Sequence, residues 1–161
     1  MKRKRFAALC CAAALLLCLS AGCSVRGRRV NAQKLLDSDF MNFHNFAAQT
    51  LYTGTLDESV YFPGVEGYDF VPPDWLGFQT GIREDEENLG ICCGFYYSPD
   101  DAPLGYKGEA MELSPFGDGY RFLMPDGRME YYTERIKPNW FFYEYNEVSN
   151  REEDPILKPE L

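Results

Sequence analysis

Apolar residues recur at a helical spacing between residues 31 and 53. Intervals of four, three, four and four residues separate Leu36, Phe40, Phe43, Ala47 and Leu51. This spacing lines one face of an α-helix, because a helix turns once in about 3.6 residues. The pattern predicts one amphipathic helix over residues 31–53. Asp37, Ser38 and Asp39 favour its first turns or a cap, and Gly54 is suited to end it.

From residue 89 onward the pattern is typical of β-strands. Residues 89–97 are continuously apolar, which indicates a strand that is buried on both faces or central in a sheet. Further strands are predicted over residues 109–116, 120–124, 128–136 and 140–146. Two of the turns between them contain Asp-Gly, a strong hairpin signal between aromatic and branched residues. Apolar and polar residues alternate over 128–136, which predicts one face exposed to solvent.

The segment between these patterns, residues 55–81, is rich in glycine, proline and aromatic residues. A short strand near Val60 and a long irregular loop around Pro72-Pro73 fit this composition. The rings of Tyr68, Trp75 and Phe78 allow two interpretations. They form either an exposed platform for a sugar ring or peptide, or a lid over the core, where large apolar side chains prefer to lie.

Together these elements predict an α+β fold. An N-terminal helix is expected to pack on a mainly antiparallel meander sheet of about five or six strands. This layout resembles that of cystatin-like rolls, and a resemblance of layout implies no function. Residues 31–146 are expected to form a single domain, and the charged tail over 147–161 is expected to be frayed.

A second apolar run, over residues 6–19, follows four basic residues at the start of the chain. A basic head followed by such a run is typical of a secretory signal. A membrane-spanning helix needs about 20 apolar residues, so this run is too short to remain as an anchor. The sequence therefore predicts export.

The end of this run, Leu-Ser-Ala-Gly-Cys over residues 19–23, resembles the lipobox of bacterial lipoproteins. Leu19 lies one position earlier than the large aliphatic residue of the commonest lipobox. The resemblance implies that residues 1–22 are a cleaved signal peptide and that Cys23 is the lipid attachment residue. Two acyl chains on a diacylglycerol, as in dual acylation, give stable membrane attachment. The alternative is an ordinary signal cut after Gly22, with Cys23 unmodified.

The expected location follows from this resemblance: the protein is exported and lipid-anchored to the outer face of the bacterial cell membrane, or to an outer membrane where one is present. Residues 23–30 are then the lipidated cysteine and a short basic linker. This linker and the next residues contain Arg26, Arg28, Arg29 and Lys34. The cluster is either attracted to anionic headgroups, by about 1 kcal/mol per residue, or a solubilising flank.

The charge of the remaining chain excludes one class of partner. From Cys23 onward the sequence has 12 basic and 25 acidic residues, a net charge of −13. Nucleic acid binding requires a basic surface that displaces counterions from phosphates. We therefore expect no nucleic acid partner.

The cysteines cannot form a framework of several disulfides in the mature chain. Of the six, three lie in the signal and Cys23 is the expected lipid site, which leaves Cys92 and Cys93. Neighbouring residues of a strand point to opposite faces, so a bond between these two needs a distorted backbone. Two buried thiols are favoured over a labile disulfide that acts as a redox switch.

The remaining candidate residues do not form a known catalytic pattern. The single histidine, His44, is expected to be a hydrogen-bonded structural residue, because no second histidine exists to share a metal and no nucleophile lies near it in sequence. The acidic stretch 100–105 departs from an EF-hand loop, since Ala102 and Leu104 occupy ligand positions. The pair Glu109 and Glu112 is favoured as surface charge. No catalytic residue, cofactor or metal site is predicted.

Two functional hypotheses follow. The first is a membrane-tethered, non-catalytic envelope module that binds an unknown protein or wall component. The alternative is a small carboxylate-dependent hydrolase that acts on envelope material. A hydrolase needs two carboxylates that converge in a cleft with at least one raised pKa, whereas a binding module needs an unusually large exposed apolar patch.

Overall fold

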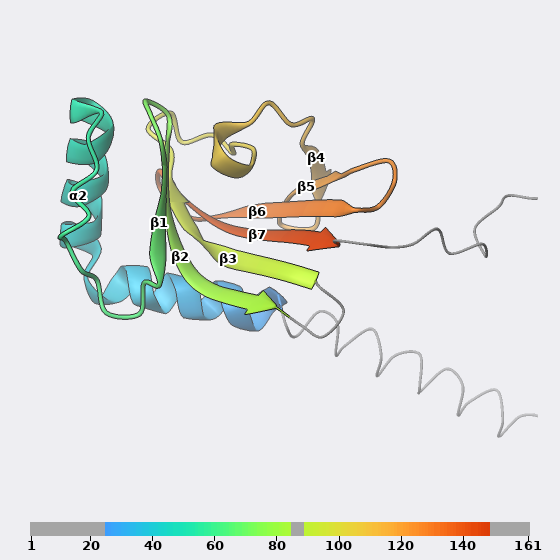
Figure 1. The fold of residues 1–161 in the computed structure, drawn as a ribbon, viewed down its shortest axis with the longest axis horizontal. Helices are drawn as coiled ribbons and strands as arrows, with labels where there is room; N and C mark the ends of the chain where they lie inside the picture. Colours follow the sequence, from blue (N-terminus) through green and yellow to red (C-terminus); the bar gives the residue numbers. More distant parts are fainter. Residues whose placement is uncertain (1–24, 85–88, 149–161) are drawn as a thin grey trace, which may run out of the picture.

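A seven-stranded antiparallel sheet organises the domain, and two helices pack on one of its faces (Figure 1). The computed structural model describes residues 25–84 and 89–148. The strands are β1 (Gly67–Val71), β2 (Trp75–Glu84), β3 (Leu89–Tyr97), β4 (Ser114–Phe116), β5 (Gly119–Leu123), β6 (Met129–Lys137) and β7 (Trp140–Val148). Their order in the sheet is β1-β2-β3-β7-β6-β5-β4. The α+β prediction is confirmed, with slightly more strands than expected.

The predicted single helix is divided into two. Residues 25–38 form a first helix, and α2 runs from Phe40 to Thr53. Asp39 separates them, because its backbone is not helical (φ −145°, ψ 41°). Figure 1 shows the two helices at a steep angle to each other. The bend brings Leu36 and Phe43 into one core, and the left-handed Gly54 ends α2 as expected.

The predicted linker over residues 23–30 is also corrected, because residues 25–30 belong to the first helix. The sequence pattern understated this helix because its first turns carry arginines in place of apolar residues. The structure gives these arginines partners on the sheet, as described below.

The face of the sheet beneath the helices forms the larger core. Its centre is Phe43, whose ring stacks on Phe62 at 4.1 Å and meets the edges of Phe78 and Phe95 at 5.2 Å each. The other buried members are Ala32, Leu36, Ala47, Leu76, Cys93, Ile136, Trp140 and Phe142. The apolar helix face predicted from spacing therefore packs on alternate residues of β2, β3 and β7.

The opposite face is also covered, by the connection between β3 and β4, residues 98–113 (Figure 1). Beneath it lie Trp75, Tyr96, Tyr131, Phe141 and Tyr143. The Tyr96 hydroxyl accepts the Leu104 N–H at 2.9 Å, and the Tyr131 hydroxyl donates to the Leu104 carbonyl at 3.0 Å. Strand β3 is therefore central and buried on both faces, as its continuous apolar run predicted.

The segment around Pro72-Pro73 differs from the expected irregular loop. It is a hairpin turn, with a cis peptide bond between the prolines, that joins β1 to β2. Val60 is not in a strand. Trp75 and Phe78 are fully buried on opposite faces of β2, so the hypothesis of an exposed aromatic platform is wrong.

The C-terminal meander follows the predicted turns. The strand expected over 109–116 is shortened to β4, three residues long with Pro115 at its centre. Strand β7 runs to Val148 and so includes the first two residues of the predicted tail; residues 149–161 lie outside the described part of the chain.

Candidate functional site

The predicted lipid attachment residue, Cys23, lies outside the described residues, and Val25 is the first residue described. Val25 is already helical, so the described chain starts within two residues of Cys23. None of the described helices is both long enough and apolar enough to cross a membrane.

Two arginines of the first helix bind carboxylates on the sheet. Arg28 donates from Nε and Nη2 to the two oxygens of Glu144, both at 2.8 Å. Arg29 Nε donates to Glu134 Oε1 at 2.6 Å, and the Tyr132 hydroxyl donates to the other oxygen of Glu134 at 2.9 Å. Both carboxylates are buried, with exposures of 4% for Glu144 and 8% for Glu134. The hydrogen bond to Glu144 raises the pKa of Arg28, which favours its charged form.

These pairs correct two expectations. The predicted exposed face of the 128–136 strand is covered by the first helix at Glu134, whereas Arg128 and Glu130 on the same face remain accessible to solvent. Arg28 and Arg29 are bound by buried carboxylates, so they serve neither as free cations for headgroups nor as a solubilising flank. A buried carboxylate and its arginine offset each other's loss of hydration.

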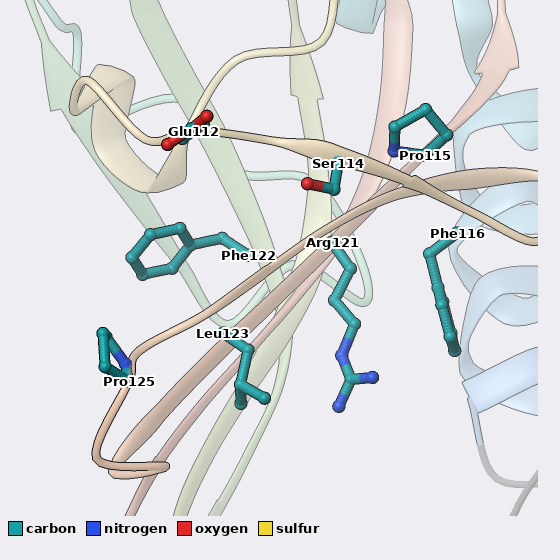
Figure 2. A pocket seen from close by; sticks show the side chains of 8 residues that line it. All are labelled: Glu112, Ser114, Pro115, Phe116, Arg121, Phe122, Leu123 and Pro125. Atoms are coloured by element: carbon teal, nitrogen blue, oxygen red, sulfur yellow. The ribbon is translucent and has the colours of Figure 1, made fainter.

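At the β4 edge of the sheet the surface is hollowed. The hollow has a volume of about 490 Å³. It is lined by Glu112, Ser114, Pro115, Phe116, Arg121, Phe122, Leu123 and Pro125. Figure 2 shows Phe116, Arg121 and Leu123 on one side of the β4–β5 ladder, and the strand register places Ser114 opposite Arg121.

Two exposed apolar side chains, Phe116 and Leu123, line this hollow, and Tyr120 and Met124 are exposed residues of β5 and of the turn that follows it. Phe116 is 53% exposed, Leu123 51%, Met124 40% and Tyr120 36%. The first helix covers β6 and β7 through its arginines, and no described element covers β4 on the outer side, since β4 is the last strand of the sheet. We name the residues that line the hollow the edge patch.

The edge patch contains one cation and one carboxylate. The Arg121 guanidinium lies over the Phe116 ring, 4.9 Å from its centre. Arg121 Nε is 2.8 Å from a Glu130 oxygen, yet it makes no directed hydrogen bond. Among the described residues that line the hollow, Glu112 is the single carboxylate. The arrangement is suited to holding a ligand by apolar contact with a few polar contacts, as binding sites commonly do.

The two thiols are separated as expected for neighbouring strand residues. Cys93 is buried on the helix face and Cys92 is half-buried on the opposite face, and both are free. Burial raises the pKa of Cys92, and raises the pKa of Cys93 to about 11. A thiol with a raised pKa is a poor nucleophile, because the thiolate is the reactive form. Their burial supports the structural interpretation.

His44 lies on α2 against aromatic rings. Its ring stacks on Phe40 at 5.8 Å and meets the edge of Tyr97 at 5.5 Å. Its Nδ1 is buried without a hydrogen-bond partner, so the expected hydrogen bond is absent at that atom. The residue packs as part of the core margin, and it faces neither a carboxylate nor a thiol in these contacts.

The acidic stretch at 100–105 locks a turn. Asp101 accepts the Asn139 backbone N–H at 2.7 Å and pairs with the Arg135 guanidinium. The Asn139 hydrogen bond, followed by the Arg135 contact, lowers the pKa of Asp101. Over residues 25–84 and 89–148, no group of three or more histidine, cysteine, aspartate or glutamate side chains is placed to hold a metal.

The edge patch was not predicted from the sequence. The sequence does place Phe116 at a hairpin tip, because it lies between Pro115 and the Gly117-Asp118-Gly119 turn. Whether its ring is buried depends on what covers β4, which spacing alone does not determine.

Comparisons with known proteins give no family. No protein-family model matches the chain, and neither the curated proteins nor the solved structures contain a significant match.

Proposed function

We propose that this chain is an exported bacterial lipoprotein, anchored through a diacylglycerol on Cys23, whose domain binds a protein partner or wall component without catalysis. The edge patch is the binding surface. The observation that supports binding is that two exposed apolar side chains, Phe116 and Leu123, line one hollow. The signal sequence over residues 1–23 supports the anchor.

The concentration of these side chains is what makes the edge patch a candidate. The other exposed apolar residues do not line the hollow: Met41 and Tyr52 lie on α2, Tyr61 in the connection after α2 and Val71 at the end of β1. Single exposed apolar residues are normal on a soluble surface, whereas a group around a hollow suggests a contact surface.

Strand addition is a less suitable mode of binding at this edge. An exposed edge strand can pair with an extended peptide through its free backbone groups. Strand β4 has three residues, and Pro115 at its centre has no N–H to donate. The side chains of the edge patch, rather than the backbone of β4, therefore supply the contact.

The hydrolase alternative is not favoured. Glu112 lines the hollow without a second carboxylate among the described lining residues, and Glu109 is exposed outside that lining. The buried carboxylates Glu134 and Glu144 are bound by arginines beneath the first helix, away from solvent. A general acid requires a carboxyl group that reaches the substrate.

In-cell crosslinking tests this proposal. A C-terminally tagged protein is compared with Cys23→Ser, Phe116→Ser and the matched control Tyr61→Ser, which removes a ring that is 75% exposed elsewhere on the domain. Wild type and Tyr61→Ser should capture one dominant partner, and Cys23→Ser and Phe116→Ser should lose it. In parallel, co-sedimentation of the purified proteins with cell-wall material tests the wall component.

Mass spectrometry of the intact protein reports the lipid on Cys23. Unmodified Cys23 would overturn the anchor. Undiminished capture by Phe116→Ser would overturn the edge patch as the binding surface. Absence of both a crosslinked partner and wall binding would overturn the binding hypothesis.

A further inference from the structure

We propose that the domain contacts the lipid bilayer through one defined end, formed by the start of the first helix at Val25 and by residues 123–128 around the β5–β6 turn. We name this surface the membrane end. The inference rests on the proposed lipid on Cys23 and adds an orientation to it: Leu123 and Met124 touch the bilayer, and the hollow opens beside it.

The strand register places the two parts of the membrane end together. Leu123 pairs with Glu130, which pairs with Asn146 of β7. Asn146 is two residues beyond Glu144, the partner of Arg28, and Arg28 is three residues after Val25. Residues advance about 3.3 Å along a strand and 1.5 Å along a helix. The start of the helix and Leu123 therefore lie at the same end of the sheet, two strands apart.

Figure 1 agrees with the register. The blue start of the first helix, the arrowhead of β7 and the β5–β6 turn all lie toward one end of the domain, and α2 lies at the other. The far end of the first helix carries Asp37, which pairs with Lys137 at the opposite end of β6.

The anchor makes this end the nearest to the membrane. Cys23 is two residues before Val25, and two residues span at most about 7 Å. The residue that would carry the acyl chains is therefore no more than about 7 Å from the start of a helix. Arg28 and Arg29 fix that helix to the sheet. Because that tether is so short, the lipid holds this end of the domain at the headgroup layer.

The surface chemistry of the membrane end suits this contact. Leu123 and Met124 are 51% and 40% exposed. The charges of the turn cancel, since Arg128 Nε lies 3.3 Å from Asp126 Oδ2. An apolar pair beside a neutral turn is suited to burial among headgroups and upper acyl chains, which is favourable for apolar surface.

Arg26, one residue after Val25, is exposed, so one basic side chain at this end is accessible to anionic headgroups. The side chains of Arg28 and Arg29 are already neutralised by Glu144 and Glu134. The contact proposed here is the apolar one made by Leu123 and Met124, which does not require anionic lipid.

This orientation also places the ligand. Leu123 and Pro125 belong both to the membrane end and to the lining of the hollow, so a partner would contact the rest of the lining, such as Ser114, Phe116 and Arg121. A partner seated on the edge patch is thus bound next to the bilayer, which favours a membrane-bound protein over one that diffuses in the envelope.

Depth-dependent fluorescence quenching tests the inference. The lipidated full-length protein is reconstituted into phosphatidylcholine vesicles that contain lipids brominated near the headgroup. Met124→Trp and Arg128→Trp are reporters in the turn, neither of which lines the hollow. Tyr52→Trp, at a residue 91% exposed near the end of α2, is the matched control. The native Trp75 and Trp140 are fully buried and supply a constant background.

We expect brominated lipid to quench the added tryptophan of Met124→Trp and Arg128→Trp at least twofold more than that of Tyr52→Trp. The difference should be the same in vesicles with and without anionic lipid. Equal quenching of all three reporters, in protein whose Cys23 carries the lipid by mass, would overturn the membrane end and leave the anchor standing. Unmodified Cys23 in protein that does not float with vesicles would overturn both. Quenching that appears only with anionic lipid would overturn the apolar contact.

Discussion

The two faces of the sheet are covered by different means. Two helices cover one face, and their contact combines an apolar core around Phe43 with the charged pairs of Arg28 and Arg29. The irregular connection 98–113 covers the other face, over stacked aromatic rings such as Trp75 and Tyr96, 4.2 Å apart. The hydroxyls of Tyr96 and Tyr131 hold that connection at Leu104.

The difference shows how an irregular segment can replace a helix as a cover. A helix satisfies its own backbone, so its side chains are free to supply apolar contacts and ion pairs. A connection without regular structure needs partners for its backbone groups, and the tyrosines supply both an apolar ring and a hydroxyl. On the aromatic face, the same tyrosine side chains thus supply both apolar contacts and hydrogen bonds. On the helix face, different side chains supply the apolar contacts and the ion pairs.

The largest effect should come from removing a tryptophan from either face. Trp75→Ala and Trp140→Ala each leave a large cavity, and each should lower the free energy of unfolding by about 3–5 kcal/mol in urea titrations. The faces should differ in limited proteolysis under native conditions. Trp75→Ala should open cleavage sites within residues 98–113, because Trp75 packs beneath that connection, and Trp140→Ala should not. Identical cleavage maps would contradict the division into two covers.

A smaller effect is expected at the ion pairs beneath the first helix. Glu144→Ala leaves the Arg28 guanidinium partly buried, with 27% of its side chain exposed, and should cost about 2 kcal/mol. In a double-mutant cycle with Arg28→Ala the coupling energy should be about 1–3 kcal/mol. The matched exposed pair, Arg128 with Asp126, should show less than about 0.5 kcal/mol. Equal coupling in the two pairs would show that burial beneath the helix adds nothing.

The smallest effect concerns the thiols on opposite faces. Burial raises the pKa of Cys93 to about 11, so the folded state favours the neutral thiol. In the unfolded chain the thiol ionises near pH 9. The contribution of the Cys93 thiol to the free energy of unfolding is therefore present below pH 9 and is lost as the pH rises through 11. Near pH 10 the loss should be on the order of 1 kcal/mol.

Urea titrations between pH 8 and pH 10.5 measure this loss. Cys93→Ala should reduce the alkaline decline in stability more than Cys92→Ala, because Cys92 is only half-buried on the aromatic face. If the stability of Cys93→Ala declines with pH as steeply as that of wild type, the Cys93 thiol is not the cause of the decline.

The features that could be predicted from the sequence are those set by local spacing. The apolar positions of the helices, the continuous run of β3 and the Asp-Gly turns each depend on neighbours a few residues away, and the structure contains all of them. The α+β class follows from these elements. Residues 37–39 were expected at the first turns or a cap of one helix, and Asp39 is the N-cap of α2. The separate helix before Asp39 was not predicted, because the same spacing fits one straight helix or two helices with a bend.

The features that were missed depend on distant partners. From the sequence alone, Arg28 and Arg29 were assigned to a basic linker. Their carboxylate partners could not be recognised, because they lie 116 and 105 residues further along the chain. The edge patch was missed for a related reason, since Phe116 is exposed only because β4 is the last strand of the sheet. The lipid site, in contrast, was predicted entirely from residues 1–23, and it stays a prediction.

The central pairing of the sheet has a consequence for how the chain is made. Strand β3 pairs with β7 over nine residues, so the half that contains the helices is joined to the rest by the last strand of the domain. Contacts between such distant segments form slowly, because a long loop must close first. We expect the chain to remain unfolded until β7 has been synthesised. For a protein on the proposed export route, this delay keeps the polypeptide threadable through a narrow channel until its whole length is available to fold on the far side.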